Sequence, residues 1–279
     1  MIARRLLLPL PALLLTRCAG SAESRPGVAS APMLEMNQAG LTQGGFVAGR
    51  TAPGTRLVLE GKPVPVSADG HFALGFPRDA GPEAALGVTP PGGRTEIRRL
   101  AIAPRHWDIQ RLNGLPPRQV TPNAQDLARI RAEQVRINAA RAVETPVALY
   151  AAGFDWPARG RISGVYGSQR ILNGEPRAPH LGLDIAVPTG TPVAPMAPGR
   201  VTLAADLYFT GNTLIVEHGQ GVASLYAHLS RIDVREGQEV ARGESMAHSG
   251  ATGRVTGPHL HLGFFVRGVS IDPGPVLGL

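Results

Sequence analysis

The chain has 279 residues and a mass of 29.3 kDa, and at roughly 100–200 residues per domain it can form one to three domains. Apolar residues make up 43% of the sequence and charged residues 18%, which excludes a broadly disordered chain, while 35 glycines and 26 prolines favour short strands and turns over a helical bundle. The net charge of +7 favours an anionic partner, but the sequence has no long basic run and only 5% aromatic residues, so we expect no nucleic-acid binding.

Residues 1–22 have the features of an export signal peptide. Two arginines precede an apolar stretch from Leu6 to Leu15, which is too short to span a bilayer, and small residues up to Ala22 provide a cleavage site. Cys18, the only cysteine, follows the apolar stretch as in a bacterial lipoprotein signal. Three alternatives follow: cleavage and release, a lipid anchor at Cys18, or an uncleaved apolar anchor. All three place the remaining chain outside the cytoplasm.

A linker is predicted over residues 23–37, where Ser, Pro, Ala and Gly occur without periodicity. From residue 38 to 104, short alternating stretches recur between turns, as at Arg56–Leu59 and at the hairpin turn Ala68–Gly70. Strands at this spacing predict a small β-sandwich. The module contains no catalytic constellation, so we expect it to act as a spacer or docking module.

A second linker is predicted over residues 105–155, and it contains the one convincing long helix, at 121–142. Thr121 can cap this helix and Pro122 suits its first position. The thin apolar face of the helix favours packing beside or between domains over binding to a membrane surface.

The last segment, 156–279, has a pattern of strands and turns throughout. Asn212–Val216 and Val222–Tyr226, for example, predict a hairpin around a glycine-rich turn. The sequence therefore predicts a mainly β protein, with an antiparallel-sheet domain at the carboxyl end, preceded by a small β-sandwich module and one helix.

Six of the eight histidines lie between residues 180 and 261. In an extended chain His180 and Asp184 share a face, and Gly182 leaves the space between them empty. His259 and His261 share a face in the same way. One histidine of this pair would complete a set of three nitrogen and oxygen ligands, which leaves a fourth position for water, as in a catalytic zinc site. The other histidine of the pair is then free for proton transfer, and His228 is a second candidate for that role.

Three separated motifs resemble those of the lysostaphin-type (LytM-like) zinc peptidases. The motifs are His180-x-Gly182-x-Asp184, Tyr226-Ala227-His228-Leu229-Ser230, and Thr252-Gly253 followed by Thr256-Gly257-Pro258-His259-Leu260-His261. Their order and spacing also match, over about residues 156–273. The segment Tyr166–Gly174 is similar to a proteobacterial branch with an amino-terminal β-module.

The resemblance implies one zinc ion held by His180, Asp184 and His261, with His228 and His259 as the catalytic pair. It implies a periplasmic endopeptidase that hydrolyses the peptide cross-links of peptidoglycan through a zinc-bound water. The alternative is a non-catalytic wall-binding regulator or amidase activator with the same fold. Such regulators usually lose zinc ligands, and this sequence keeps all three. The partner is then the peptidoglycan stem peptide, while the bond cleaved, the oligomeric state and the role of the β-module stay open.

Overall fold

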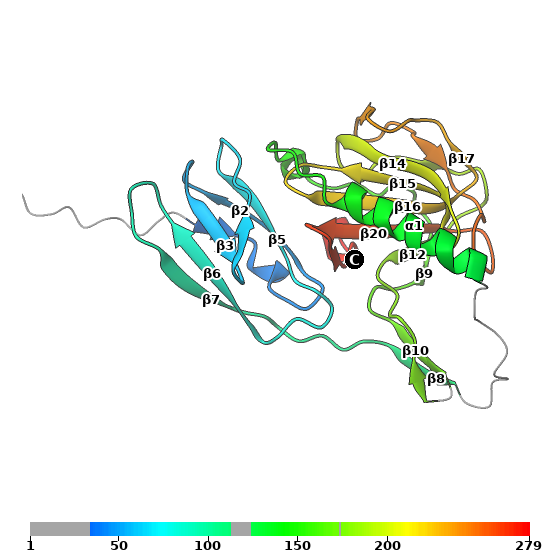
Figure 1. The fold of residues 1–279 in the computed structure, drawn as a ribbon, viewed down its shortest axis with the longest axis horizontal. Coiled ribbons are helices and arrows are strands. Elements are labelled where there is room, and N and C mark those ends of the chain that lie inside the picture. Colours follow the sequence, from blue (N-terminus) through cyan, green and yellow to red (C-terminus); the bar gives the residue numbers. More distant parts are fainter. Residues whose placement is uncertain (1–33, 113–123, 173) are drawn as a thin grey trace, which may run out of the picture. The chain divides into compact units, whose positions relative to one another are not determined.

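A computed structural model describes residues 34–112, 124–172 and 174–279, which form strands and loops with one α-helix (Figure 1). The predicted signal peptide with Cys18, most of the predicted linker 23–37, and the predicted helix cap at Thr121 and Pro122 lie outside the described residues. Across the described part of the chain, no helix is both long enough and apolar enough to cross a membrane.

The amino-terminal part forms two antiparallel sheets around a shared core. The strand order is β1–β2–β5 in one sheet and β4–β3–β6–β7 in the other. Side chains from both sheets, including Val47, Phe72 and Leu86, are fully buried in this core. The predicted β-sandwich is confirmed, and β1 adds residues from the end of the predicted linker to it. Its elements are β1 (Leu34–Met36), η1 (Gln38–Gly40), β2 (Phe46–Thr51), β3 (Arg56–Leu59), β4 (Lys62–Val64), β5 (His71–Gly75), β6 (Glu83–Thr89) and β7 (Glu96–Ala101).

The carboxy-terminal part is built on an eight-stranded antiparallel sheet. Its order is β18–β14–β15–β16–β20–β12–β9, and β21 pairs with β20. Two small sheets accompany it, β13–β19–β17 and β11–β10–β8. The strands are β8 (Ile109–Leu112), β9 (Arg161–Gly164), β10 (Gln169–Leu172), β11 (Glu175–Pro176), β12 (Leu183–Ala186), β13 (Pro192–Val193), β14 (Gly199–Leu207), β15 (Gly211–Glu217), β16 (Val222–Leu229), β17 (Arg231–Ile232), β18 (Glu239–Val240), β19 (Ala247–His248), β20 (Leu260–Val266) and β21 (Val269–Ile271).

The two faces of the large sheet are covered differently. On β20 the alternate residues Leu260, Leu262, Phe264 and Val266 belong to the main core. The opposite face of the sheet carries a smaller cluster, in which Phe265 of β20 is joined by Ala140 of α1 (Ala124–Arg141). Figure 1 shows α1 lying across β14, β15 and β16. His261 alternates with Leu260 and Leu262, so it lies on the same face as α1.

The helix and the hairpin predicted from the sequence are present, since α1 lies within 121–142 and the turn at 218–221 joins β15 to β16. Two further elements lie inside the predicted linker 105–155. Strand β8 pairs in parallel with β10, about 60 residues later in the chain, and a short 3-10 helix η2 (Leu149–Ala152) follows α1. Outside this linker, another 3-10 helix, η3 (Pro275–Leu277), follows β21. The boundaries of the five predicted segments stay a prediction.

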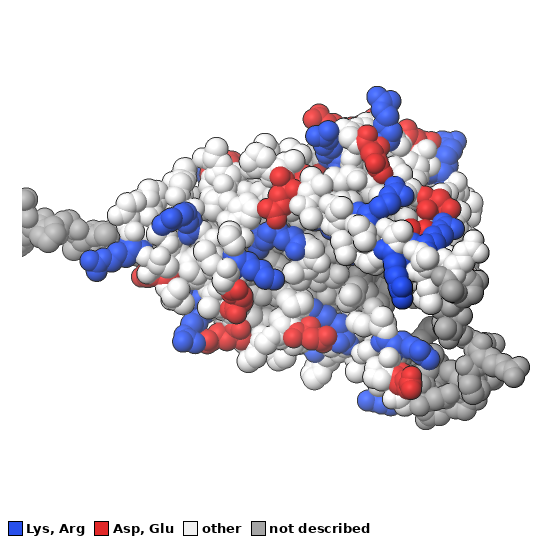
Figure 2. Space-filling model, in the orientation of Figure 1, with Lys and Arg blue, Asp and Glu red and all other residues white. Residues whose placement is uncertain are grey.

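Charged side chains of both signs mix on the face of the molecule in Figure 2. Several basic groups pair with acidic neighbours, as in Arg99 with Glu83 and Arg129 with Glu133. The excess of positive charge is therefore not gathered into one basic patch on this face.

Candidate metal centre

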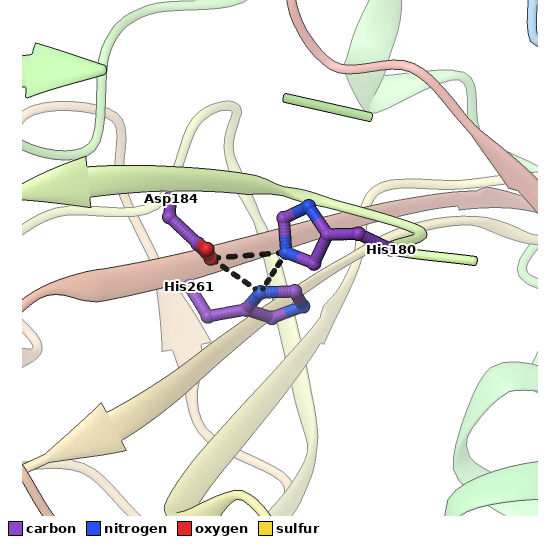
Figure 3. Close-up of side chains that lie close together, drawn as sticks. All are labelled: His180, Asp184 and His261. Carbon is purple, nitrogen blue, oxygen red and sulfur yellow. Dashed lines mark hydrogen bonds and ion pairs between the residues drawn. The ribbon is translucent and has the colours of Figure 1, made fainter. Parts of the chain in front are cut away.

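Three side chains from separate segments meet on the large sheet (Figure 3). Asp184 lies on β12 and His261 on the adjacent strand β20, where the two residues are register partners. His180 precedes β12, which begins at Leu183, so a turn rather than the strand itself brings this imidazole to Asp184. His180 and Asp184 meet as the sequence predicts, but the backbone between them is not one continuous strand.

The distances among the three donor atoms suit a tetrahedral metal ion. His180 Nε2 lies 3.1 Å from Asp184 Oδ1 and 3.1 Å from His261 Nδ1, and the last two atoms are 2.8 Å apart. In a zinc site with bonds of about 2.0–2.1 Å, two ligand atoms are about 3.3 Å apart. Each side chain keeps 19–25% of its surface exposed, so an ion and a further small ligand can reach the cluster.

Two glycines make room for this cluster. A Cβ on Gly182 would stand 2.7 Å from His261 Nε2, so the ring of His261 occupies the space that the missing side chain leaves. A Cβ on Gly164 of β9 would overlap the carboxylate of Asp184. The space predicted at Gly182 is therefore filled by a third donor residue from a distant part of the chain.

The protonation states of two of the three donors suit metal binding. Burial opposes ionisation of Asp184, but hydrogen bonds from His180 and His261 outweigh it and hold the pKa of this carboxyl well below its ordinary range. Burial lowers the pKa of His261. Burial is the largest single influence on His180 and acts in the same direction, but the hydrogen bond to Asp184, the charge of Asp184 and the hydrogen bond to Val165 O together outweigh burial and raise that pKa. At neutral pH Asp184 is ionised and His261 neutral, as metal ligands must be, whereas a metal ion has to compete with a proton at His180.

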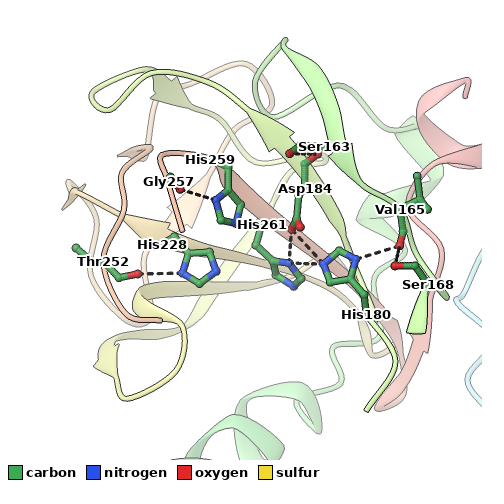
Figure 4. A network of polar contacts seen from close by, with 10 residues as sticks. All are labelled: Ser163, Val165, Ser168, His180, Asp184, His228, Thr252, Gly257, His259 and His261. Atoms are coloured by element: carbon green, nitrogen blue, oxygen red, sulfur yellow. Dashed lines mark hydrogen bonds and ion pairs between the residues drawn. The ribbon is translucent and has the colours of Figure 1, made fainter. Parts of the chain in front are cut away.

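His228 and His259 lie beside the three donors (Figure 4). The ring centroids of His228 and His259 are 4.8 Å apart, and His259 Nε2 lies 3.9 Å from Asp184 Oδ1. The Nδ1 atom of His228 is 2.9 Å from Thr252 O, and that of His259 is 2.9 Å from Gly257 O. A neutral imidazole that donates from Nδ1 to a carbonyl has Nε2 free to accept a proton.

His228 is held in an unusual backbone state near the end of β16. Its φ angle of 61° lies in the left-handed region, which residues other than glycine rarely adopt. Burial lowers the pKa of this imidazole to about 4. His228 is therefore neutral at pH 7 and can act as a proton acceptor or as a hydrogen-bond donor.

The structure thus brings together all five residues singled out from the sequence, while His218 and His248 lie elsewhere. His218 is fully buried, between Pro198 O at 2.8 Å and Ser224 Oγ at 2.7 Å. Sequence reasoning missed the backbone carbonyls that orient the site imidazoles, such as Val165 O, 3.0 Å from His180 Nδ1. A carbonyl carries no side-chain signal, so no pattern of residue types could have found it.

Comparison with known proteins gives a consistent result. The sequence model of peptidase family M23 matches residues 178–273, a range that contains His180, Asp184, His228, His259 and His261. A solved structure of a peptidase M23 from Pseudomonas aeruginosa is 31% identical, with a TM-score of 0.67, and the match covers 85% of this chain and 95% of that one. The chain therefore belongs to peptidase family M23. The family resemblance and the mainly β fold class predicted from the sequence are confirmed.

Two curated relatives carry descriptions of activity. The peptidoglycan DD-endopeptidase ShyA of Vibrio cholerae is 43% identical over 113 residues, which are 40% of this chain and 26% of that protein. The DD-carboxypeptidase/endopeptidase Mpg of Neisseria meningitidis is 43% identical over 94 residues, 34% of this chain and 22% of that protein. The chain matches about a quarter of the length of these relatives.

Proposed function

We propose that the chain is a zinc metalloendopeptidase that hydrolyses peptide cross-links of peptidoglycan outside the cytoplasm. The observation that carries the proposal is the convergence of His180, Asp184 and His261 within hydrogen-bonding distance of one another, beside two further imidazoles. Membership of peptidase family M23 and the similarity to ShyA, a peptidoglycan DD-endopeptidase, support the substrate class, and the endopeptidase activity in the description of Mpg supports the reaction type. The alternative of a non-catalytic regulator is less well supported, because all three donors are present.

The donor set fits zinc, since two imidazole nitrogens and one carboxylate oxygen form a three-ligand set with room for a further ligand. When bound, zinc supplies a Lewis acid that polarises a carbonyl and makes water more acidic. The proposed ligands are His180 through Nε2, Asp184 through Oδ1 and His261 through Nδ1.

The two other histidines have the proton-transfer role in this proposal. Each holds its Nδ1 proton toward a backbone carbonyl, so Nε2 of His228 and of His259 can take a proton from water. Once protonated, an imidazole can donate a hydrogen bond to the oxyanion that develops at the scissile carbonyl, and can return the proton to the leaving amine.

The test is digestion of purified Gram-negative sacculi by the chain, with muropeptides identified by mass spectrometry. We expect cross-linked dimers to become monomers, with the reaction stopped by a chelator and restored by zinc. His180→Ala, His228→Ala and His259→Ala should each lower the rate by about 100-fold or more. His71→Ala, on the β-sandwich, is the matched control and should keep full activity.

Other outcomes would overturn the proposal in identifiable ways. Release of intact stem peptides from glycan would indicate an amidase. A protein that binds zinc tightly but releases no product from sacculi would support the regulatory alternative. Full activity of the His180→Ala variant would show that the site assignment is wrong.

A further inference from the structure

One loop, Val165–Gln169, surrounds His180 and fixes its position (Figure 4). The backbone N–H of His180 donates to Ser168 O at 2.8 Å, and its carbonyl accepts from the N–H of Gly167 at 2.7 Å. The carbonyl of Val165 lies 3.0 Å from His180 Nδ1, which leaves Nε2 to face Asp184. Because His180 precedes β12, this loop rather than a strand ladder holds the residue.

Arg78, from the β-sandwich, holds the loop from the other side. Its Nε donates to Gly167 O at 2.9 Å, and the side chain is buried. Gly167 has a φ angle of 83°, and a Cβ there would overlap the ring of Trp107. Both the backbone angle and the close approach of Trp107 therefore require glycine at this position. Gly167, whose N–H bonds to the carbonyl of His180, is thus clamped at its own carbonyl by Arg78 and at its Cα by the ring of Trp107.

Trp107 is itself fixed by its neighbours. The guanidinium carbons of Arg78 and Arg105 lie 5.2 Å and 4.6 Å from its ring centroid, and Tyr166 makes an edge contact at 5.7 Å. Arg105 Nη1 is 2.8 Å from a carboxylate oxygen of the buried Asp272. The clamp is therefore a preorganised assembly rather than a single contact.

We infer that Arg78 and Trp107 are positioning residues for His180, so that the segment from the β-sandwich to β8 helps to hold the metal-binding geometry. The inference rests on the proposed function and deepens it by giving the β-sandwich and its following segment a role in metal affinity. The two residues act on His180 through their contacts with Gly167. Residues that orient a ligand typically change metal affinity by about 10- to 100-fold when they are lost.

The test is zinc affinity of the full chain, measured by competition with a chromogenic chelator. We expect Arg78→Met and Trp107→Leu each to weaken zinc binding by about 10-fold or more. Trp107→Phe keeps part of the ring and should lie between wild type and Trp107→Leu. Arg99→Met, which removes an exposed arginine of the same sandwich, is the control and should bind zinc as wild type does.

A second measurement separates positioning from general stability. The visible spectrum of the Co²⁺-substituted protein reports ligand geometry, and we expect it to change in both clamp variants and not in Arg99→Met. Circular dichroism checks that each metal-free variant is folded, and Trp107→Phe and Arg78→Lys replace any variant that is not. Zinc affinity and Co²⁺ spectra equal to wild type in folded clamp variants would overturn the inference. Absence of zinc binding by the wild type would instead overturn the proposed function.

Discussion

Gly182 has no side chain, and the ring of His261 fills the place where a Cβ would stand. Its φ angle is not in the left-handed region, so the requirement for glycine comes from this close approach alone. We expect Gly182→Ala to push His261 out of line and to lower zinc affinity by about 10-fold or more.

The matched control is Gly257→Ala, near the same site, where a Cβ would meet no atom within 4 Å. Chelator competition on both variants provides the measurement. Equal affinities in the two variants would mean that the ring of His261 can move aside without cost.

His218 is a buried histidine away from the site, and burial lowers its pKa to about 4. In the unfolded chain an imidazole has a pKa near 6.5, so between pH 6.5 and 4 the unfolded state binds more protons than the folded state. The stability that this residue contributes is complete above pH 6.5 and is lost as the pH falls toward 4. We expect a loss of about 3 kcal/mol over that interval.

The measurement is urea denaturation of chelator-treated protein at pH 7, 5.5 and 4. His218→Gln retains hydrogen-bonding capacity but cannot titrate. Between pH 7 and pH 4 the free energy of unfolding of this variant should therefore fall by about 3 kcal/mol less than that of the wild type. The same pH dependence in both proteins would exclude His218 as the source.

At the scale of elements, α1 is attached to the sheet by polar contacts as well as by its small apolar face, and Glu133 makes one of these contacts. Glu133 accepts from Arg129 Nε at 2.6 Å and from the backbone N–H of Tyr208 at 2.8 Å, at the turn after β14. We expect Glu133→Ala to lower the free energy of unfolding by about 1–2 kcal/mol. Hydrogen exchange should rise in α1 and stay unchanged in β16.

Gln134→Ala is the control, since Gln134 is exposed and, within the described part of the chain, its side chain bonds only to Asn138 of the same helix. A comparable loss of stability in both variants would show that the helix itself, and not its attachment, is being weakened.

Among the elements, those set by local signals could be predicted from the sequence, and those set by distant partners could not. The β15–β16 hairpin and the common face of His259 and His261 follow from alternation and turn residues, which are local signals. The pairing of β8 with β10 and the turn before β12 depend on distant partners, and nothing near Ile109 or His180 in the sequence specifies them. His180, Asp184 and the pair of His259 and His261 could be selected because chemistry restricts metal ligands to few residue types. The choice of His261 as the ligand, and the role of His228, came from the family resemblance. The clamp at Gly167 could not be selected, because it acts through backbone atoms.

At the scale of the whole molecule, the β-sandwich and the large sheet share part of a core. Phe46 of β2 packs against Tyr150, Phe154 and Phe264, with the Phe264 ring centroid 5.2 Å away. Phe72, by contrast, is buried within the sandwich. We expect the described parts of the chain to unfold together, so that Phe72→Ala, which costs about 3–5 kcal/mol, also lowers protection of β15 and β16.

Calorimetry and hydrogen exchange of the full chain test this coupling. Ala85→Gly, at an exposed position of β6, is the control and should shift the melting temperature much less. Two separate heat transitions, of which Phe72→Ala moved only one, would show that the two parts unfold independently.

The register that pairs Asp184 with His261 joins two donors that lie far apart in the sequence. His261 is on β20, which lies between β12 and β16, so the three donors meet only when β20 is in place. Because a metal ion binds strongly only to the complete set of donors, its binding free energy is available only to a chain in which β20 is paired. A bound ion would therefore oppose the local opening of the sheet between β12 and β20.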